Sequence, residues 1–181
     1  MNETITPTPL KAGMTLGILF GVIMILQFII AYVMNIDAMT APAYGWTINI
    51  LNYLVLPALF ISLACKNFKR LNNGFISFGQ CLKTGVALCV IAGIIAAVFS
   101  VIFTLIFPEF MEETLRKAEQ VMIEQNPQMT AEQVEMGMSW ARKLSNPALV
   151  IPFSVLMYAF LGLIHSLIIG AIVKNDKPES F

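Results

Sequence analysis

The chain of 181 residues is rich in apolar residues and poor in charged ones. Hydrophobic residues make up 57% of it and charged residues only 12%, about half the share that is usual in soluble domains. Eleven basic and eleven acidic residues balance each other, so no overall field would attract nucleic acid, and we exclude nucleic acid as a partner. This composition predicts a membrane protein.

Four long stretches contain no Asp, Glu, Lys or Arg, and each exceeds the roughly 20 helical residues that cross a bilayer. These stretches are residues 13–36, 44–65, 84–107 and 148–173. We therefore predict an all-α polytopic membrane protein with four transmembrane helices, in contact with the lipid bilayer and organised as a single membrane domain over residues 1–181. No A-x-A-like cleavage site follows the first stretch, so we expect it to be an uncleaved anchor.

Small residues recur at four-residue intervals on three of the stretches, a spacing that lets helix backbones approach closely in lipid. The predicted packing residues are Gly13, Gly17 and Gly21 on the first stretch, Gly85, Cys89, Gly93 and Ala97 on the third, and Gly162, Ser166 and Gly170 on the fourth. We expect the small faces of the first and fourth stretches to meet each other. In the second stretch, Pro57 is predicted to interrupt the backbone hydrogen bonds.

The few polar residues within the stretches form the candidate functional site, because each needs a partner where water is absent. The candidates are Gln27, Asn52, Tyr53, Tyr158 and His165. At about 1.5 Å per residue, five polar residues lie in one layer, about 20 to 26 Å from the basic residues that mark one membrane edge: Gln27, Asn49, Asn52, Tyr53 and Tyr158. By the same estimate, His165 lies near mid-membrane. We expect Gly162 to open a small polar cavity between Tyr158 and His165. One interpretation makes His165 a proton relay or a contact for a ligand. The interpretation that we favour makes it a neutral histidine that donates one hydrogen bond to a neighbouring helix.

The three cysteines, Cys65, Cys81 and Cys89, show no metal-ligand spacing. We expect them to act as small residues that the membrane tolerates, on a reducing side of it. Likewise, a single Met136-Gly-Met138 pair does not make a copper site. We therefore predict no metal site and no cofactor.

The connection between the third and fourth stretches reads as a helical hairpin over residues 109–145. Asn126-Pro127 is predicted to break it, and Thr130 followed by Gln133 fits a capping box for the second helix. We expect one of two sets of residues to form the apolar stripe of that helix: Val134, Met138 and Ala141, or Met136, Trp140 and Leu144.

Basic residues divide unevenly between the two sides of the membrane. Lys11, Lys66, Lys69, Arg70, Lys83, Lys174 and Lys177 fall on one side. Arg116, Lys117, Arg142 and Lys143 fall on the other, among seven glutamates of the hairpin. By the positive-inside rule, both termini face the cytoplasm and the hairpin lies on the outer side.

Two short segments resemble a known family. They are Asn73-Gly74-Phe75-Ile76-Ser77-Phe78-Gly79-Gln80, which leads into the third stretch, and Phe107-Pro108-Glu109-Phe110, which leads into the hairpin. With the four stretches, they resemble the domain-of-unknown-function 4199 family (DUF4199) of small bacterial membrane proteins, over nearly the full chain. The resemblance implies a four-helix protein of the bacterial cytoplasmic (inner) membrane, and it brings no established activity or catalytic residues.

Two functions remain open. The sequence contains no G-x-S-x-G, H-E-x-x-H or Walker-type motif, so we expect neither an enzyme nor catalytic residues. The leading hypothesis is an envelope accessory or scaffolding subunit whose residues 109–145 bind a membrane or periplasmic protein. The alternative is an oligomeric small-solute or ion pathway lined by His165, Tyr158, Asn52 and Gln27, which would be a homo-oligomer because four short spans show no internal repeat.

Overall fold

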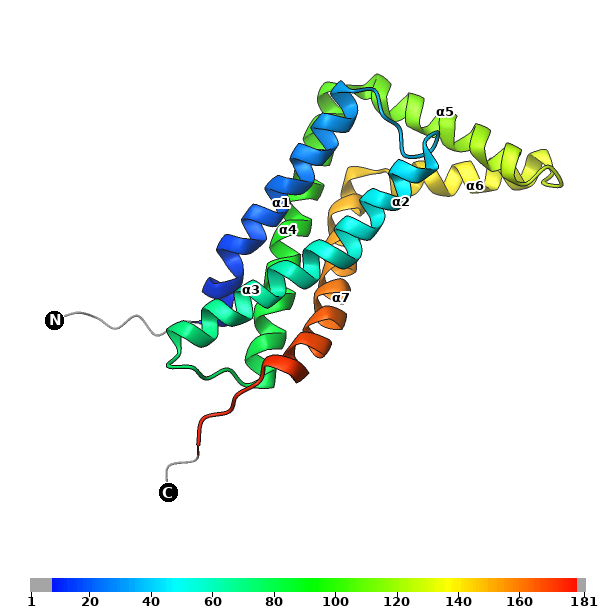
Figure 1. Ribbon diagram of the computed structural model, residues 1–181. Coiled ribbons are helices and arrows are strands. Elements are labelled where there is room, and N and C mark those ends of the chain that lie inside the picture. Colours follow the sequence, from blue (N-terminus) through cyan, green and yellow to red (C-terminus); the bar gives the residue numbers. More distant parts are fainter. Residues whose placement is uncertain (1–7, 179–181) are drawn as a thin grey trace.

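The computed structural model describes residues 8–178, which are all-α apart from one isolated pair of bridged residues (Figure 1). The elements are α1 (Pro9–Val33), α2 (Pro42–Ile50), a π-helical turn η1 (Leu51–Val55), α3 (Leu56–Leu71), α4 (Phe78–Ile106), α5 (Pro108–Gln125), α6 (Ala131–Leu144) and α7 (Pro147–Val173). Helices α2 and α3 continue through η1 as one span, so four helices of 25 to 30 residues are long and apolar enough to cross a membrane. The prediction of four spans, with a hairpin between the third and fourth, is confirmed.

Helix α4 lies at the centre of the bundle, between α1 and α7 (Figure 1). The span formed by α2, η1 and α3 crosses the other helices diagonally. Both described chain ends lie at one end of the bundle, which we call the terminal end. The α5–α6 hairpin lies at the opposite end, which we call the hairpin end.

Glycines on α1 bring its backbone against that of α4. A Cβ atom on Gly13 would lie 2.7 Å from the carbonyl oxygen of Thr84, and one on Gly17 would lie 2.7 Å from that of Leu88. Real side chains do not come so close, so only glycine fits at these two positions. The predicted packing face of the first span is therefore in use, with α4 as its partner.

Glycines at the contact of α4 with α7 allow the same approach. A Cβ atom on Gly162 would lie 3.0 Å from the Gly85 carbonyl oxygen, and one on Gly93 would lie 2.8 Å from the ring of Tyr158. The expectation that the small faces of the first and fourth spans meet each other is wrong, because each packs on α4 instead. A four-residue repeat marks a face that can be approached, but it does not identify the neighbour.

Aromatic contacts in the middle of the bundle join α1 to α3 and to α7. The fully buried ring of Phe20 on α1 stacks on Phe60 of α3, with ring centroids 5.5 Å apart. It also meets Tyr158 of α7 at 6.5 Å in an edge arrangement. Such pairs add about 0.5–1.5 kcal/mol beyond simple packing.

Contacts between distant segments hold the terminal end together. The chain leaves α3 through Asn73 and Gly74, which both adopt positive φ and so turn the chain towards α4. Ile76 pairs with Asn175 through two backbone hydrogen bonds of 2.9 and 2.8 Å. The ammonium of Lys69 donates to the Val173 carbonyl at 3.2 Å, which satisfies one free carbonyl at the end of α7.

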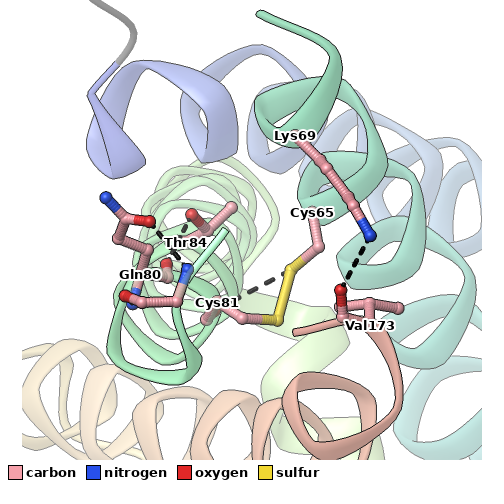
Figure 2. The surroundings of a disulfide bond; sticks show 7 residues. Cys65, Lys69, Gln80, Cys81, Thr84 and Val173 are labelled. Carbon is pink, nitrogen blue, oxygen red and sulfur yellow. Dashed lines mark hydrogen bonds between the residues drawn. A yellow bond between two sulfur atoms is a disulfide. The ribbon is translucent and has the colours of Figure 1, made fainter. Parts of the chain in front are cut away.

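A disulfide between Cys65 of α3 and Cys81 of α4 lies beside these contacts (Figure 2). The turn after α3 brings the two Cα atoms to 5.7 Å, and both residues are fully buried. The expectation that all three cysteines are only small residues is therefore wrong for this pair, whereas Cys89 is a free buried thiol. Spacing alone gave no sign of the pair, because sixteen residues and a turn separate its members.

The hairpin follows the predicted signals closely. Helix α5 ends at Asn126, and Thr130 and Gln133 form the capping box that starts α6. Of the two predicted apolar stripes of α6, the one with Val134 and Met138 is buried within the fold. The other stripe stays uncovered, with Met136 and Trp140 each 59% exposed and Leu144 51% exposed.

We expect Gly17→Ala to lower the melting temperature of the detergent-purified protein by several degrees, because the added methyl group forces α1 away from the Leu88 backbone. Gly79→Ala is the matched control. It sits in the first turn of α4 with no atom near its would-be Cβ, so its melting temperature should stay the same or rise. Equal melting temperatures for the two variants would contradict the backbone contact.

The disulfide can be tested by counting thiols. Protein purified without reductant and unfolded in the presence of an alkylating agent should carry one adduct by intact mass, at Cys89, and three adducts after reduction. Cys65→Ser frees Cys81 and should give two adducts without reductant. Three adducts on the untreated wild type would show that Cys65 and Cys81 are reduced in the cell.

Candidate functional site

A cavity of about 430 Å³ lies at the hairpin end, among α1, the α2–η1 span, α4 and the start of α5. The loop from Met34 to Ala41 contributes Asn35, Ile36, Asp37, Ala38 and Met39 to its lining. Such a volume is within the range of pockets that bind small molecules. We call it the hairpin-end cavity.

An irregular turn in the second span places Asn52 at this cavity. Pro57 has no N–H to give to the preceding turn, and η1 lies directly before it. There the backbone N–H of Leu56 bonds to the carbonyl of Leu51, five residues back. The predicted interruption at Pro57 is confirmed as a π-helical turn, a feature that is often found at functional sites.

Aromatic side chains form much of the wall of the cavity and also attach α5 to the bundle. Phe110 of α5 meets Phe28 and Tyr32 of α1 at centroid distances of 5.6 and 5.7 Å. It also meets Phe103 of α4 at 5.2 Å. The rings that line the cavity are Phe28, Tyr32, Tyr44, Phe99 and Phe110.

Two amide side chains line the cavity without completing their hydrogen bonds. Within residues 8–178, the buried oxygens Oε1 of Gln27 and Oδ1 of Asn52 have no hydrogen-bond partner. Leaving a buried polar atom unpaired costs about 1–3 kcal/mol, so two such atoms at one cavity call for an explanation. The third unpaired oxygen of this kind, Oγ of Ser166, lies in the α4–α7 contact instead.

Three charged side chains, Asp37, Glu113 and Lys117, also line the cavity, and we call them the rim cluster. The Lys117 ammonium lies 2.9 Å from a carboxylate oxygen of Asp37 and 2.8 Å from one of Glu113. The first contact joins α5 to the loop after α1, so the hairpin and the loop are tied together over the cavity.

The ion pairs shift the pKa of each member of the rim cluster. Burial raises the pKa of Asp37, but the hydrogen bond from Lys117 and the Met39 amide outweigh it, so the net shift is downward. The hydrogen bond from Lys117 also lowers the pKa of Glu113. Hydrogen bonds to Glu113 and then to Asp37 raise the pKa of Lys117.

The structure brings only two of the five predicted site residues to the cavity. Gln27 and Asn52 line it, as their shared height in the membrane predicted. Tyr53 is half-exposed on the bundle surface, with its ring 6.4 Å from that of Tyr158. Asn49, expected in the same layer, is exposed.

Tyr158 and His165 lie elsewhere on α7, and Tyr158 packs against Gly93 of α4. Both are about 92% buried; the Tyr158 hydroxyl lies 3.5 Å from the sulfur of Met24 and the Nδ1 of His165 lies 2.9 Å from the Leu161 carbonyl. The expected cavity between them is wrong, because Gly85, Val86 and Cys89 of α4 fill the space at Gly162. The partner of His165 is also on its own helix rather than a neighbouring one.

The rim cluster and the aromatic wall were missed from the sequence. Asp37 and Lys117 lie 80 positions apart and meet only because α5 folds back over the loop. The usable local signal was the spacing of Glu113 and Lys117, which are four residues apart on a helix and therefore on one face.

Acid should loosen the tie between α5 and the loop. The pKa values of Asp37 and Glu113 are lowered on folding, so their stabilisation is present above the unfolded pKa values near 4 and is lost as the pH falls through the folded ones. Amide hydrogen exchange in residues 34–41, corrected for the intrinsic pH effect, should rise between pH 6 and pH 3. Lys117→Met should show fast exchange at both pH values; a pH step that persists in this variant would assign the effect to other groups.

The comparisons with known proteins place the chain without giving it an activity. No curated protein and no solved structure matches it. The model of one family, described as protein of unknown function, matches residues 15–175, which is nearly the whole chain. With four membrane-spanning helices and this match, the chain belongs to the DUF4199 family.

Proposed function

We propose that this multi-pass membrane protein is a non-enzymatic accessory or scaffolding subunit of the bacterial cytoplasmic membrane. Its bundle anchors the α5–α6 hairpin, which binds a partner protein at the outer surface. In this orientation the terminal end faces the reducing cytoplasm, and the Cys65–Cys81 disulfide persists there because both of its residues are fully buried, out of reach of cytoplasmic thiols. The basic residues support it, because seven Lys and Arg residues lie at the terminal end and four lie in the hairpin.

The observation that carries this proposal is the second apolar stripe of α6. One stripe of the helix, with Val134 and Met138, is buried within the fold, and Gly137 beside it meets the end of Met122 from α5. The second stripe, with Met136, Trp140 and Leu144, is more than half exposed. Met and Trp are enriched at protein interfaces, and Trp dominates their binding energy.

A protein fits this stripe better than a lipid surface does. Helices that lie on membranes have a broad apolar face and a polar face rich in Lys and Arg. In α6 the exposed stripe has only three large side chains, and its polar positions include Glu132 and Glu135, which anionic headgroups repel. Lys143 lies 5.1 Å above the Trp140 ring, so one of the two basic residues of α6 already has a partner.

The alternative function, a pathway lined by His165, Tyr158, Asn52 and Gln27, gains less support. Gln27 and Asn52 share the hairpin-end cavity, but Tyr158 and His165 are not among its lining residues, and Tyr158 packs against Gly93 of α4. A continuous polar route through these four side chains would therefore need α4 and α7 to separate. That would break the backbone contacts at Gly162.

The proposal predicts a partner that depends on Trp140. A tagged copy extracted from its own membrane in mild detergent should retain a second protein in fixed stoichiometry. Trp140→Ala with Met136→Ala should weaken that retention about thirty-fold, the effect of losing about 2 kcal/mol at a hot spot. The matched control is Leu156→Ala on α7, equally apolar and 67% exposed but distant along the chain, which should retain the partner.

Photo-crosslinking distinguishes the remaining occupants of the stripe. A benzophenone side chain at position 136 should capture the partner protein in intact membranes, whereas one at position 156 should capture lipid. Lipid adducts alone at position 136, or a pure homo-oligomer whose assembly ignores Trp140, would overturn the proposal.

A further inference from the structure

The hairpin-end cavity has a chemistry of its own, which the binding of a partner by α6 does not use. It is enclosed by four helical elements and a loop, and it contains aromatic rings, two incompletely bonded amides and the rim cluster. Each of these three features selects a different part of a ligand. A ligand in this cavity does not depend on the proposed partner of α6.

The two amides select a hydrogen-bond donor. The unpaired atoms, Oε1 of Gln27 and Oδ1 of Asn52, are both acceptors, so the missing group is an O–H or N–H. Gln27 lies six residues, or about 9 Å, before the end of α1, and Asn52 lies ten residues, or about 15 Å, after the start of α2. Both therefore lie well below the loop that bears Asp37.

The rim cluster selects a cation. It holds two carboxylates and a single ammonium, so its net charge is −1 when all three groups are ionised. Lys117 is already shared between both carboxylates, and Arg116 acts on Glu113 through its charge without forming an ion pair, so the cluster can still take a ligand cation as a direct partner of Asp37 and Glu113. An anionic ligand would meet Asp37 and Glu113 and be repelled.

The aromatic rings that line the cavity select an apolar or aromatic body. Phe28 and Phe99 belong to an edge-to-face cluster, with centroids 5.6 Å apart, and Tyr44 adds a ring from the opposite span. Aromatic faces also attract cations, whereas they offer nothing to a carboxylate. The cavity thus has charge on its loop side, and rings and amides deeper in the membrane.

We propose that the hairpin-end cavity binds a small amphipathic organic amine. Its ammonium group lies at the carboxylates of Asp37 and Glu113, its apolar body lies between the aromatic rings, and a hydroxyl or N–H at its far end donates to Gln27 and Asn52. The amine is a soluble one, because an amine-headed lipid such as phosphatidylethanolamine has an ammonium group but no O–H or N–H at the far end of its apolar part.

Three probe compounds of nearly equal size separate these contributions. Tyramine has an ammonium, a ring and a distal hydroxyl; phenethylamine lacks the hydroxyl; 3-(4-hydroxyphenyl)propanoate replaces the ammonium by a carboxylate. We would measure saturable binding of labelled tyramine to the full-length protein in nanodiscs of phosphatidylcholine and phosphatidylglycerol, with the other two as competitors. Tyramine should bind at least ten-fold more tightly than the carboxylate and several-fold more tightly than phenethylamine.

Variants assign each preference to its residues. Gln27→Leu with Asn52→Leu should remove the advantage of tyramine over phenethylamine, whereas Asp37→Asn with Glu113→Gln should weaken both amines equally. Asn49→Leu is the matched control, an exposed amide three residues from Asn52 on the same span, and should change nothing. Ala96→Phe, which fills the cavity from α4, should abolish binding of all three compounds.

The same assay identifies the source of the amine and can overturn the proposal. Unchanged tyramine binding when phosphatidylethanolamine is added to the nanodiscs would identify a soluble amine as the occupant. Loss of binding would show that the lipid occupies the cavity, and would contradict the need for a donor at the far end of the ligand. The proposal is wrong if wild type shows no saturable binding, if the carboxylate binds as tightly as tyramine, or if the Leu variants keep the preference for the hydroxyl while melting at the wild-type temperature.

Discussion

Backbone contact between α4 and its two neighbours is the constraint on which the other features of this bundle depend. Lipid tails are as apolar as the side chains, so helix association in a membrane relies on close packing rather than on the hydrophobic effect. Gly13 and Gly17 bring α1 onto α4 from one side, and Gly162 brings α7 onto it from the other. These contacts lie towards the terminal end, where the cross-links between α3, α4 and the end of α7 are also found.

Towards the hairpin end, large aromatic residues replace the glycines. After Gly21, α1 continues with Phe28 and Tyr32, and after Ala97, α4 continues with Phe99 and Phe103. Helices with aromatic rings between them cannot approach as closely as helices with glycines between them. The π-helical turn also makes the second span irregular at the same level. The cavity therefore follows from a gradient of residue size along the helices, and the aromatic cluster that keeps them apart also holds α5 in place.

Sequence reasoning predicted what each helix does alone better than what helices do together. The four spans follow from uncharged apolar stretches, and the start of α6 follows from Thr130 and Gln133, because both signals are local. The neighbour of each helix was harder to predict. The four-residue repeats that contain Gly17 and Gly162 were correctly predicted as contact faces, but their common neighbour α4 was not predicted. Cys65 with Cys81, and Asp37 with Lys117, meet only through a turn and a fold-back that no periodicity reports. Gln27 and Asn52 were placed together because the helical rise alone fixes their height.

Helix α5 contacts both the hairpin-end cavity and α6. It lines the cavity with Phe110, Glu113 and Lys117, and it meets α6 through Met122 near Gly137. A ligand that contacts the rim cluster thus touches the same helix that supports the exposed stripe of α6. If α5 has two positions and both the ligand and the partner on α6 distinguish them, linkage requires each to change the affinity of the other by the same factor. Without such coupling, either α5 keeps one position, held by its aromatic contacts with α1 and α4, or one of the two binders does not distinguish its positions.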